Sequence, residues 1–205
     1  MNRRILGGRA IASLCLAFLA GCMALPAGAA LRPGATAPDF TAPASLAGKT
    51  FTFSLREALA KGPVVVYFYP AAYTKGCDIE AHTFATKKTA FTAAGATIIG
   101  VSADPIARLD RFSADPDYCA GKFPVASDPD GKIAARYGVK MSPPQPGVID
   151  VKGQDVTHGF FARTTFVLNR GGKVVAAMSS QADGLTPAQH VTDSLHVVQK
   201  LQKED

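Results

Sequence analysis

Apolar residues gather along this chain in short runs, separated by segments in which they recur at helical spacing. Residues 64–69 read Val-Val-Val-Tyr-Phe-Tyr and are bounded by Pro63 and Pro70. A continuous β-branched and aromatic run of this length is typical of a central strand that is covered on both faces. Residues 78–93 carry spaced aromatic residues among Lys and Thr and predict a helix, and residues 97–101 predict a second buried strand.

Shorter segments also have the apolar patterns of strands. They comprise residues 51–55, 123–126, 163–168 and 173–178. The last two flank Asn-Arg-Gly-Gly at positions 169–172, and together they predict a hairpin. Residues 31–48 are rich in Pro, Gly and Ala and predict an extended, loop-like opening segment. Residues 139–162 predict a loop excursion that precedes the hairpin.

Three dipeptides that end in proline mark expected helix starts. Asp104-Pro105 offers an N-cap and a proline at the first helical position, and Asp128-Pro129 caps a helix that Gly138 ends. A calcium loop from Asp128 would lack its closing glutamate. Thr186-Pro187 opens a closing amphipathic helix. Strands that alternate with helices before a hairpin and a last helix predict an α/β domain with a thioredoxin-like three-layer fold, a central mixed sheet flanked by helices.

The first thirty residues differ in composition from the rest of the chain. Three arginines precede an almost uninterrupted apolar stretch over residues 10–25, and no acidic residue occurs before Asp39. This pattern predicts a secretory signal peptide over residues 1–30 and a folded domain over residues 31–205. A membrane-spanning helix is the alternative, but the apolar run is short and is interrupted at Pro26.

A lipoprotein signal is a second reading of the same leader. Leu19-Ala20-Gly21-Cys22 is similar to the lipobox of bacterial lipoproteins. Processing before Cys22 would leave a lipidated N-terminus, whereas processing after Ala29 or Ala30 would release a soluble protein. Both routes predict an exported, periplasmic protein.

Removal of the leader changes the charge and the cysteine count. The formal charge of +6 falls to +3 without the three leader arginines, which is too mild to indicate a nucleic-acid or membrane-surface partner. Of the four cysteines, Cys15 lies in the leader and Cys22 is discarded or lipidated. Cys77 and Cys119 remain, as either a structural disulfide or a redox pair.

Cys77 is the candidate nucleophile. It stands at the start of the predicted helix, seven residues after Pro70, near the carboxyl end of a buried strand. Unpaired backbone N–H groups and the helix dipole favour a thiolate there. A fall in cysteine pKa from about 8.5 to about 6 requires roughly 3.4 kcal/mol, whereas a helix end supplies about 2 kcal/mol at most. We therefore expect a cationic partner. An ordinary buried thiol is the alternative.

Pro70 and Thr74, both N-terminal to Cys77, are suited to line a pocket around its sulfur. The Thr74 hydroxyl can hydrogen-bond both the sulfur and an incoming oxygen, and Pro70 closes the loop and shields the thiolate from water. With Gly76 and Glu80, this Pro-x-x-x-Thr-x-x-Cys spacing resembles the peroxiredoxins of the AhpC/TSA superfamily, most closely the bacterioferritin-comigratory or PrxQ branch. The resemblance covers about residues 31–180.

The resemblance implies an activity and the residues that carry it. Arg163 matches the family arginine that contacts the thiolate. Cys77 would attack a peroxide oxygen and become a sulfenic acid, while Thr74, Arg163 and backbone N–H groups hold the two oxygens. The implied reaction is thiol-dependent reduction of hydrogen peroxide or organic hydroperoxides, with no metal or other cofactor. The implied partners are peroxide and a thioredoxin-like or other thiol reductant, with monomer or homodimer left open.

Two positions depart from the PrxQ pattern. Lys75 stands where relatives often have proline, and His82 stands five residues after Cys77, where local resolvers carry their second cysteine. Some relatives carry the resolving cysteine in the third helix, somewhat earlier than Cys119, so the resemblance makes Cys119 the candidate resolving cysteine. The alternative is a one-cysteine enzyme with Cys119 buried or paired between subunits.

Other functions are alternatives to a peroxidase. A thiol–disulfide oxidoreductase would normally need Cys-x-x-Cys, but Glu80 occupies the second cysteine position. A non-enzymatic redox sensor or binding module stays open. Cys77 and His82 form half a metal site without further ligands. His158, His190 and His196 are scattered along the sequence, and His190 and His196 are expected on the surface of the closing helix. Phe160-Phe161 is either core or an apolar wall near Arg163.

Overall fold

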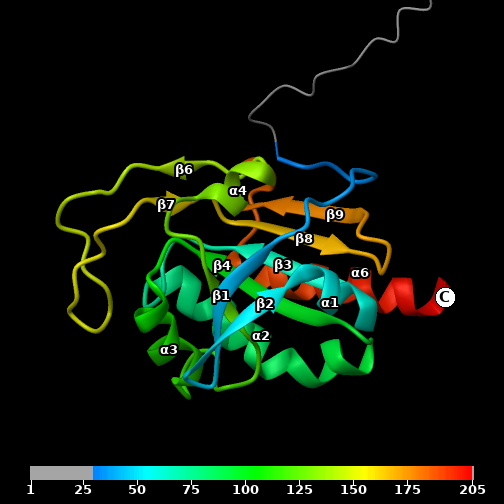
Figure 1. The fold of residues 1–205 in the computed structure, drawn as a ribbon, viewed down its shortest axis with the longest axis horizontal. Coiled ribbons are helices and arrows are strands. Elements are labelled where there is room, and N and C mark those ends of the chain that lie inside the picture. The colour runs from blue at the N-terminus through cyan, green and yellow to red at the C-terminus, as the bar shows by residue number, and fades with distance from the viewer. Residues whose placement is uncertain (1–29, 205) are drawn as a thin grey trace, which may run out of the picture.

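The computed structural model describes residues 30–204, which form a seven-stranded mixed sheet with helices on both faces (Figure 1). The strand order is β2-β1-β5-β4-β3-β8-β9. The strands are β1 (Thr41–Leu46), β2 (Lys49–Ser54), β3 (Val64–Phe68), β4 (Thr97–Ser102), β5 (Val125–Ser127), β8 (Thr164–Leu168) and β9 (Val174–Ser179). The helices are α1 (Leu55–Lys61), α2 (Lys75–Ala93), α3 (Ile106–Ala114), α4 (Lys132–Arg136), α5 (Ser180–Asp183) and α6 (Pro187–Glu204).

Strand β3 is the centre of the sheet. It pairs in parallel with β4 and antiparallel with β8, so that Val66 lies between Ile99 and Phe166. Its side chains alternate between two apolar clusters: Val64, Val66 and Phe68 pack with α1 and α4, whereas Val65, Tyr67 and Tyr69 pack with α2, α3 and α6. The prediction of a central mixed sheet covered on both faces is therefore confirmed.

The opening segment is more regular than predicted. Residues 41–46 form β1, which pairs antiparallel with β2 along its full length. Phe40, Ala42 and Ala44 are buried at alternate positions, so the strand period is present. Small alanines and Pro43 conceal that period in a hydropathy pattern. The prediction of an extended loop over residues 31–48 is thus wrong for this part.

The first of the proline-marked helix starts is also corrected. Helix α3 begins at Ile106, and Pro105 occupies the N-cap position without a side-chain cap. The Asp104 carboxylate does not cap this helix but accepts a hydrogen bond from the Ala72 backbone N–H at 2.8 Å. At the second start, α4 begins only at Lys132 and its N-cap residue is Gly131. Asp128 still satisfies the first turn, because its Oδ2 accepts from the N–H groups of Ile133 and Ala134 at 3.0 and 2.9 Å.

The excursion before the hairpin carries a small hairpin of its own. β6 (Met141–Ser142) pairs with β7 (Phe160–Phe161), and the segment between them extends away from the main sheet (Figure 1). Phe161 is buried and its ring lies 6.1 Å from that of Phe68, which confirms a core role; Phe160 is half-buried.

Two further observations concern membranes and the leader. Within residues 30–204, none of the helices combines the length and the apolar character needed to cross a membrane. The predicted signal peptide, Cys15 and the lipobox cysteine Cys22 lie outside the described residues, except for Ala30 at the end of the leader. Those predictions stay predictions.

Candidate active site

The chain turns from β3 into α2 at the position where the nucleophile was predicted. Thr74 is the N-cap of α2 and Cys77 is its third residue. The Cys77 side chain is buried, with the residue only 1% exposed. Arg163 Nη2 donates a hydrogen bond to the Cys77 sulfur at 3.2 Å. The structure thus brings the predicted thiol and the predicted cation into direct contact.

Arg163 reaches the sulfur because of where β8 lies and because residue 76 is small. It immediately precedes β8, the antiparallel neighbour of β3, so its side chain starts beside the carboxyl end of β3. A Cβ atom at Gly76 would lie 3.1 Å from Arg163 Nη2. Glycine at this position therefore leaves the guanidinium room to lie against the first turn of α2.

The loop from Pro70 to Thr74 shapes the remaining wall. Pro70 follows β3 and is half-buried, and the Thr74 hydroxyl donates to the Ala71 carbonyl at 2.8 Å. Tyr73 has φ +59°, a left-handed conformation that non-glycine residues rarely adopt. Its ring packs edge-on against Phe112 at 5.1 Å. Tertiary packing thus holds a strained backbone one residue before the predicted catalytic threonine.

The direction of the Cys77 pKa differs from the expectation. Burial raises the pKa of Cys77, and this outweighs the lowering caused by Arg163, by a hydrogen bond with Thr74 and by one with the Ala71 backbone. The helix end and a cation can be expected from the sequence, whereas complete desolvation of the sulfur is a property of the folded chain. In this closed arrangement the three contacts offset burial only in part.

Glu80 is a site residue whose role the sequence analysis missed. It lies one turn after Cys77 on α2, is fully buried, and pairs with Arg163 Nη1 through Oε2. Its Oε1 has no hydrogen-bond partner among the described residues. Burial raises the pKa of Glu80 to about 7, although Arg163 opposes this shift. A charged residue in helical phase with Cys77 and Phe84 was the available signal, because that face of α2 is the buried one.

Cys119 lies in the turn that follows α3, and its side chain is fully buried. Cys77 and Cys119 are both free, and they belong to the same apolar cluster, packed among Tyr67, Tyr69 and the helices α2, α3 and α6. Burial raises the pKa of Cys119 well above its usual value. The structure therefore shows both residues as buried thiols, with no disulfide between them.

Comparisons with known proteins decide the family. The AhpC/TSA family profile matches residues 33–177 of the chain. The chain belongs to the AhpC/TSA family, the peroxiredoxins. Peroxiredoxin Bcp of Xanthomonas campestris pathovar campestris is 36% identical over 141 residues, which are 69% of this chain and 80% of that relative.

Solved structures agree with this assignment. Peroxidoxin BcpB of Mycobacterium tuberculosis has a TM-score of 0.68 and 29% identity over 83% of this chain and 98% of its own. A bacterioferritin comigratory protein of Xanthomonas campestris has a TM-score of 0.60 and 30% identity over 78% of this chain and 91% of its own. The predicted branch, the thioredoxin-like fold and the thiol-dependent peroxidase class are confirmed.

One histidine of this peroxiredoxin lies elsewhere than predicted. His190 is fully buried on α6 rather than exposed, and it hydrogen-bonds Thr165 Oγ1 and Ser180 Oγ, each at 2.9 Å. Burial and the nearby charge of Arg163 lower the pKa of His190 to about 4. A neutral His190 therefore ties α6 to β8 two residues after Arg163. His196 is exposed, as predicted.

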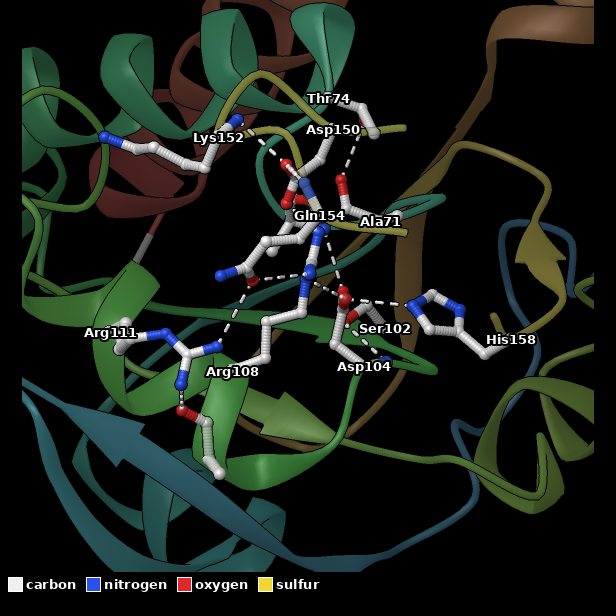
Figure 2. A network of polar contacts seen from close by, with 12 residues as sticks. Ala71, Thr74, Ser102, Asp104, Arg108, Arg111, Asp150, Lys152, Gln154 and His158 are labelled. Atoms are coloured by element: carbon white, nitrogen blue, oxygen red, sulfur yellow. Dashed lines mark hydrogen bonds and ion pairs between the residues drawn. The ribbon is translucent and has the colours of Figure 1, made fainter. Parts of the chain in front are cut away.

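A buried polar network binds the backbone of the loop that precedes Cys77 in this peroxiredoxin (Figure 2). Arg108 on α3 pairs with Asp104 at 3.0 Å and with Asp150 of the excursion at 2.5 Å, and its Nη2 donates to the Ala72 carbonyl at 3.1 Å. Asp104 also lies 2.9 Å from His158 Nε2. Burial lowers the pKa of His158, but the hydrogen bond and the charge of Asp104 outweigh it, so that the pKa is raised.

We predict that Arg108→Met lowers the free energy of unfolding by about 3 kcal/mol, because two buried carboxylates lose their shared cation. His158 stays beside Asp104 and limits the loss. Urea unfolding followed by circular dichroism measures it. The matched control is Arg111→Met on the exposed side of the same helix, for which we expect a change within about 0.5 kcal/mol. Equal losses in the two variants would contradict the prediction.

Metal ligands do not gather in the part of the chain that the structure describes. Within residues 30–204, no three His, Cys, Asp or Glu side chains lie close enough to hold an ion. His82, the second half of the weak Cys77–His82 pattern, has its Nδ1 3.0 Å from the Asp117 carbonyl instead.

Proposed function

We propose that this chain reduces hydrogen peroxide and organic hydroperoxides at Cys77. The observation that carries the proposal is the Arg163 guanidinium on a buried Cys77 sulfur at the first turn of α2. The Cys77 thiolate attacks one peroxide oxygen with an electron pair, and the O–O bond breaks. The departing oxygen takes a proton and leaves as water or an alcohol, and Cys77 becomes a sulfenic acid.

Each neighbouring residue has a role in that step. Arg163 stabilises the thiolate and the charge that develops on the departing oxygen. The Thr74 hydroxyl, directed at Ala71 in this structure, faces the incoming oxygens when substrate is present. Pro70 covers the loop and limits water at the sulfur. Glu80 holds the guanidinium in place. The bacterioferritin comigratory protein with a similar fold was solved in a study of alkyl peroxide reduction, which supports organic hydroperoxides as substrates.

Cys119 then resolves the sulfenic acid as an intramolecular disulfide with Cys77. Both thiols lie in one apolar cluster, which supports this pairing over a bond between subunits. Because both are buried, the first turn of α2 or the turn around Cys119 unwinds before they meet. A thioredoxin-like or other small thiol reductant returns the disulfide to two thiols.

The test follows peroxide and thiols together. The reduced chain without its leader is mixed with peroxide in a stopped-flow instrument, and samples are acid-quenched, alkylated and weighed by mass spectrometry. We expect peroxide consumption far faster than by free cysteine, followed by a Cys77–Cys119 disulfide. Consumption no faster than by free cysteine would defeat the peroxidase proposal. A lasting sulfenic acid with Cys119 free would defeat only the resolving role.

The enzyme acts outside the cytoplasm in this proposal. The arginines, the apolar run and the small residues before residue 31 support export to the periplasm, with Cys22 as the lipid anchor if processing occurs at the lipobox. Cell fractionation and the mass of the mature N-terminus distinguish the two routes. The number of subunits, one or two, is read from light scattering of the same material.

A further inference from the structure

Asp78 is a buried acid that the peroxide step does not use. It follows Cys77 directly in the first turn of α2 and is only 9% exposed. Its Oδ1 has no hydrogen-bond partner among residues 30–204. A carboxyl oxygen that is buried and left without a donor is costly, and such atoms in native proteins often have a function.

The face of α2 that carries Asp78 packs on the turn that carries Cys119. Asp78 and His82 are four residues apart and so share one helix face. His82 Nδ1 lies 3.0 Å from the Asp117 carbonyl, two residues before Cys119. Asp78 is thus the neighbour of Cys77 in sequence, and it lies on the helix face that contacts the turn of Cys119.

Lys152 closes the same space from the excursion. Its ammonium lies 5.4 Å from the ring centres of both Tyr73 and Tyr118, and 3.2 Å from Asp115. The rings of Tyr73 and Tyr118 meet edge-on at 5.4 Å. The loop before Cys77 and the residue before Cys119 are therefore in contact, next to the first turn of α2 that carries Asp78.

The charges around Asp78 come from three segments. Burial raises the pKa of Asp78 to about 7, and the carboxylates of Asp115 and Asp150 add to the shift. Lys152 and a backbone hydrogen bond from Tyr73 oppose it. The facing turn also carries the exposed acid Asp117, together with Tyr118 and Cys119, and the charge of Asp78 contributes to the raised pKa of Tyr118 and of Cys119.

The resolving step requires a proton to move within this space. The Cys119 thiol must lose its proton to become a nucleophile, and burial makes its spontaneous ionisation unfavourable. The hydroxide that leaves the Cys77 sulfenic acid needs a proton to depart as water. One group that accepts a proton near pH 7 and gives it back serves both needs.

We propose that the Asp78 carboxylate accepts the proton of the Cys119 thiol as this sulfur attacks Cys77, and returns the proton to the departing hydroxide. The Cys119 sulfur supplies the electron pair of the new S–S bond, and the pair of the broken S–O bond leaves with oxygen as water. No further oxidant or reductant takes part. Because Asp78 adjoins Cys77, unwinding of the first turn moves both together. This inference rests on the resolving role proposed for Cys119.

The test separates formation of the sulfenic acid from formation of the disulfide. Wild type and Asp78→Asn are mixed with excess peroxide, quenched over time, alkylated and weighed. We expect Cys77 to oxidise in Asp78→Asn at a rate within about threefold of wild type. We expect the disulfide to form roughly 100-fold more slowly, with Cys77 sulfinic acid accumulating instead. Asp117→Asn, an exposed acid of the same turn, is the matched control and resolves at the wild-type rate.

The pH dependence of the disulfide rate is a second test, because a purely structural role for Asp78 would leave it unchanged. In wild type the disulfide rate rises with pH and levels off above about 7, because only the Asp78 carboxylate accepts the proton. In Asp78→Asn the rate keeps rising toward the higher pKa of Cys119. Asp78→Glu restores an acceptor and recovers part of the rate.

The outcomes are distinct. Equal disulfide rates in wild type and Asp78→Asn overturn the role of Asp78. A wild-type pH profile without an inflection near pH 7 also overturns it, and this result does not depend on whether the asparagine variant folds. Absence of Cys77 oxidation in wild type defeats the peroxidase proposal instead. Oxidation of Cys77 without any disulfide in wild type defeats the resolving role of Cys119, and with it the role of Asp78.

Discussion

Cys77→Ser is expected to lower the second-order rate constant of peroxide reduction by ~10³-fold or more. A serine hydroxyl beside Arg163 is almost fully protonated at neutral pH and is a far weaker nucleophile than a thiolate. A factor of ~10³ corresponds to about 4 kcal/mol of lost transition-state stabilisation. Stopped-flow consumption of hydrogen peroxide measures the loss.

The matched control is the other buried thiol. Cys119→Ser keeps the first turnover, because Cys77 and Arg163 are untouched, but its sulfenic acid persists and steady-state turnover falls. Both substitutions change one sulfur to oxygen in the same apolar cluster, so effects on folding should be similar. Undiminished consumption in Cys77→Ser, or loss of the first turnover in Cys119→Ser, would contradict the assignment of the two roles.

The central part of the fold could be read from the sequence because its signals are local. Strand β3 is five consecutive fully buried residues, and such a run has few readings other than a covered strand. The spacing of Pro70, Thr74 and Cys77 is also local, within one loop and one helical turn. A pattern that is complete within one short segment can be recognised in the sequence without knowledge of the tertiary structure.

Strand β1 could not be found in the same way. Its buried residues are Ala42, Ala44 and Ser45, and none of them is a large apolar side chain that would mark a strand in the sequence. Only pairing with β2 and β5 makes it a strand, and that pairing is a tertiary fact.

The polar network and the pKa values had no local signal either. Arg108 and Asp150 are 42 residues apart and meet only because the excursion folds back over α3. Asp104 has the sequence context of an N-cap, yet its carboxylate contacts the Ala72 N–H, the Arg108 guanidinium and the His158 ring instead. The pKa of Cys77 depends on how completely the loop buries the sulfur, and burial is a property of the folded chain.

Arg163→Met is expected to slow Cys77 oxidation by about 10²- to 10³-fold. The substitution removes the donor to the sulfur and to the departing oxygen, a loss of the size seen when one such donor is deleted. It also removes the positive charge that lowers the pKa of Cys77, so less thiolate is present at neutral pH. The ultraviolet absorbance of the thiolate, followed against pH, should show a higher pKa in the variant. Arg56→Met, at an exposed arginine paired with Asp39, is the control.

The effect of Arg163→Met on stability is separable from its effect on chemistry. The substitution leaves the buried carboxyl of Glu80 without its cation, which costs about 3 kcal/mol before protonation relieves it. The double variant Arg163→Met/Glu80→Gln removes that carboxyl and should recover the free energy of unfolding. The recovery should grow as the pH rises above the ordinary pKa of a glutamate, because without Arg163 burial alone acts on Glu80 and raises its pKa further. The rate should stay low in the double variant, because the donor to the sulfur is still absent. Recovery of the rate together with stability would show that Arg163 acts through the fold and not on the reacting oxygens.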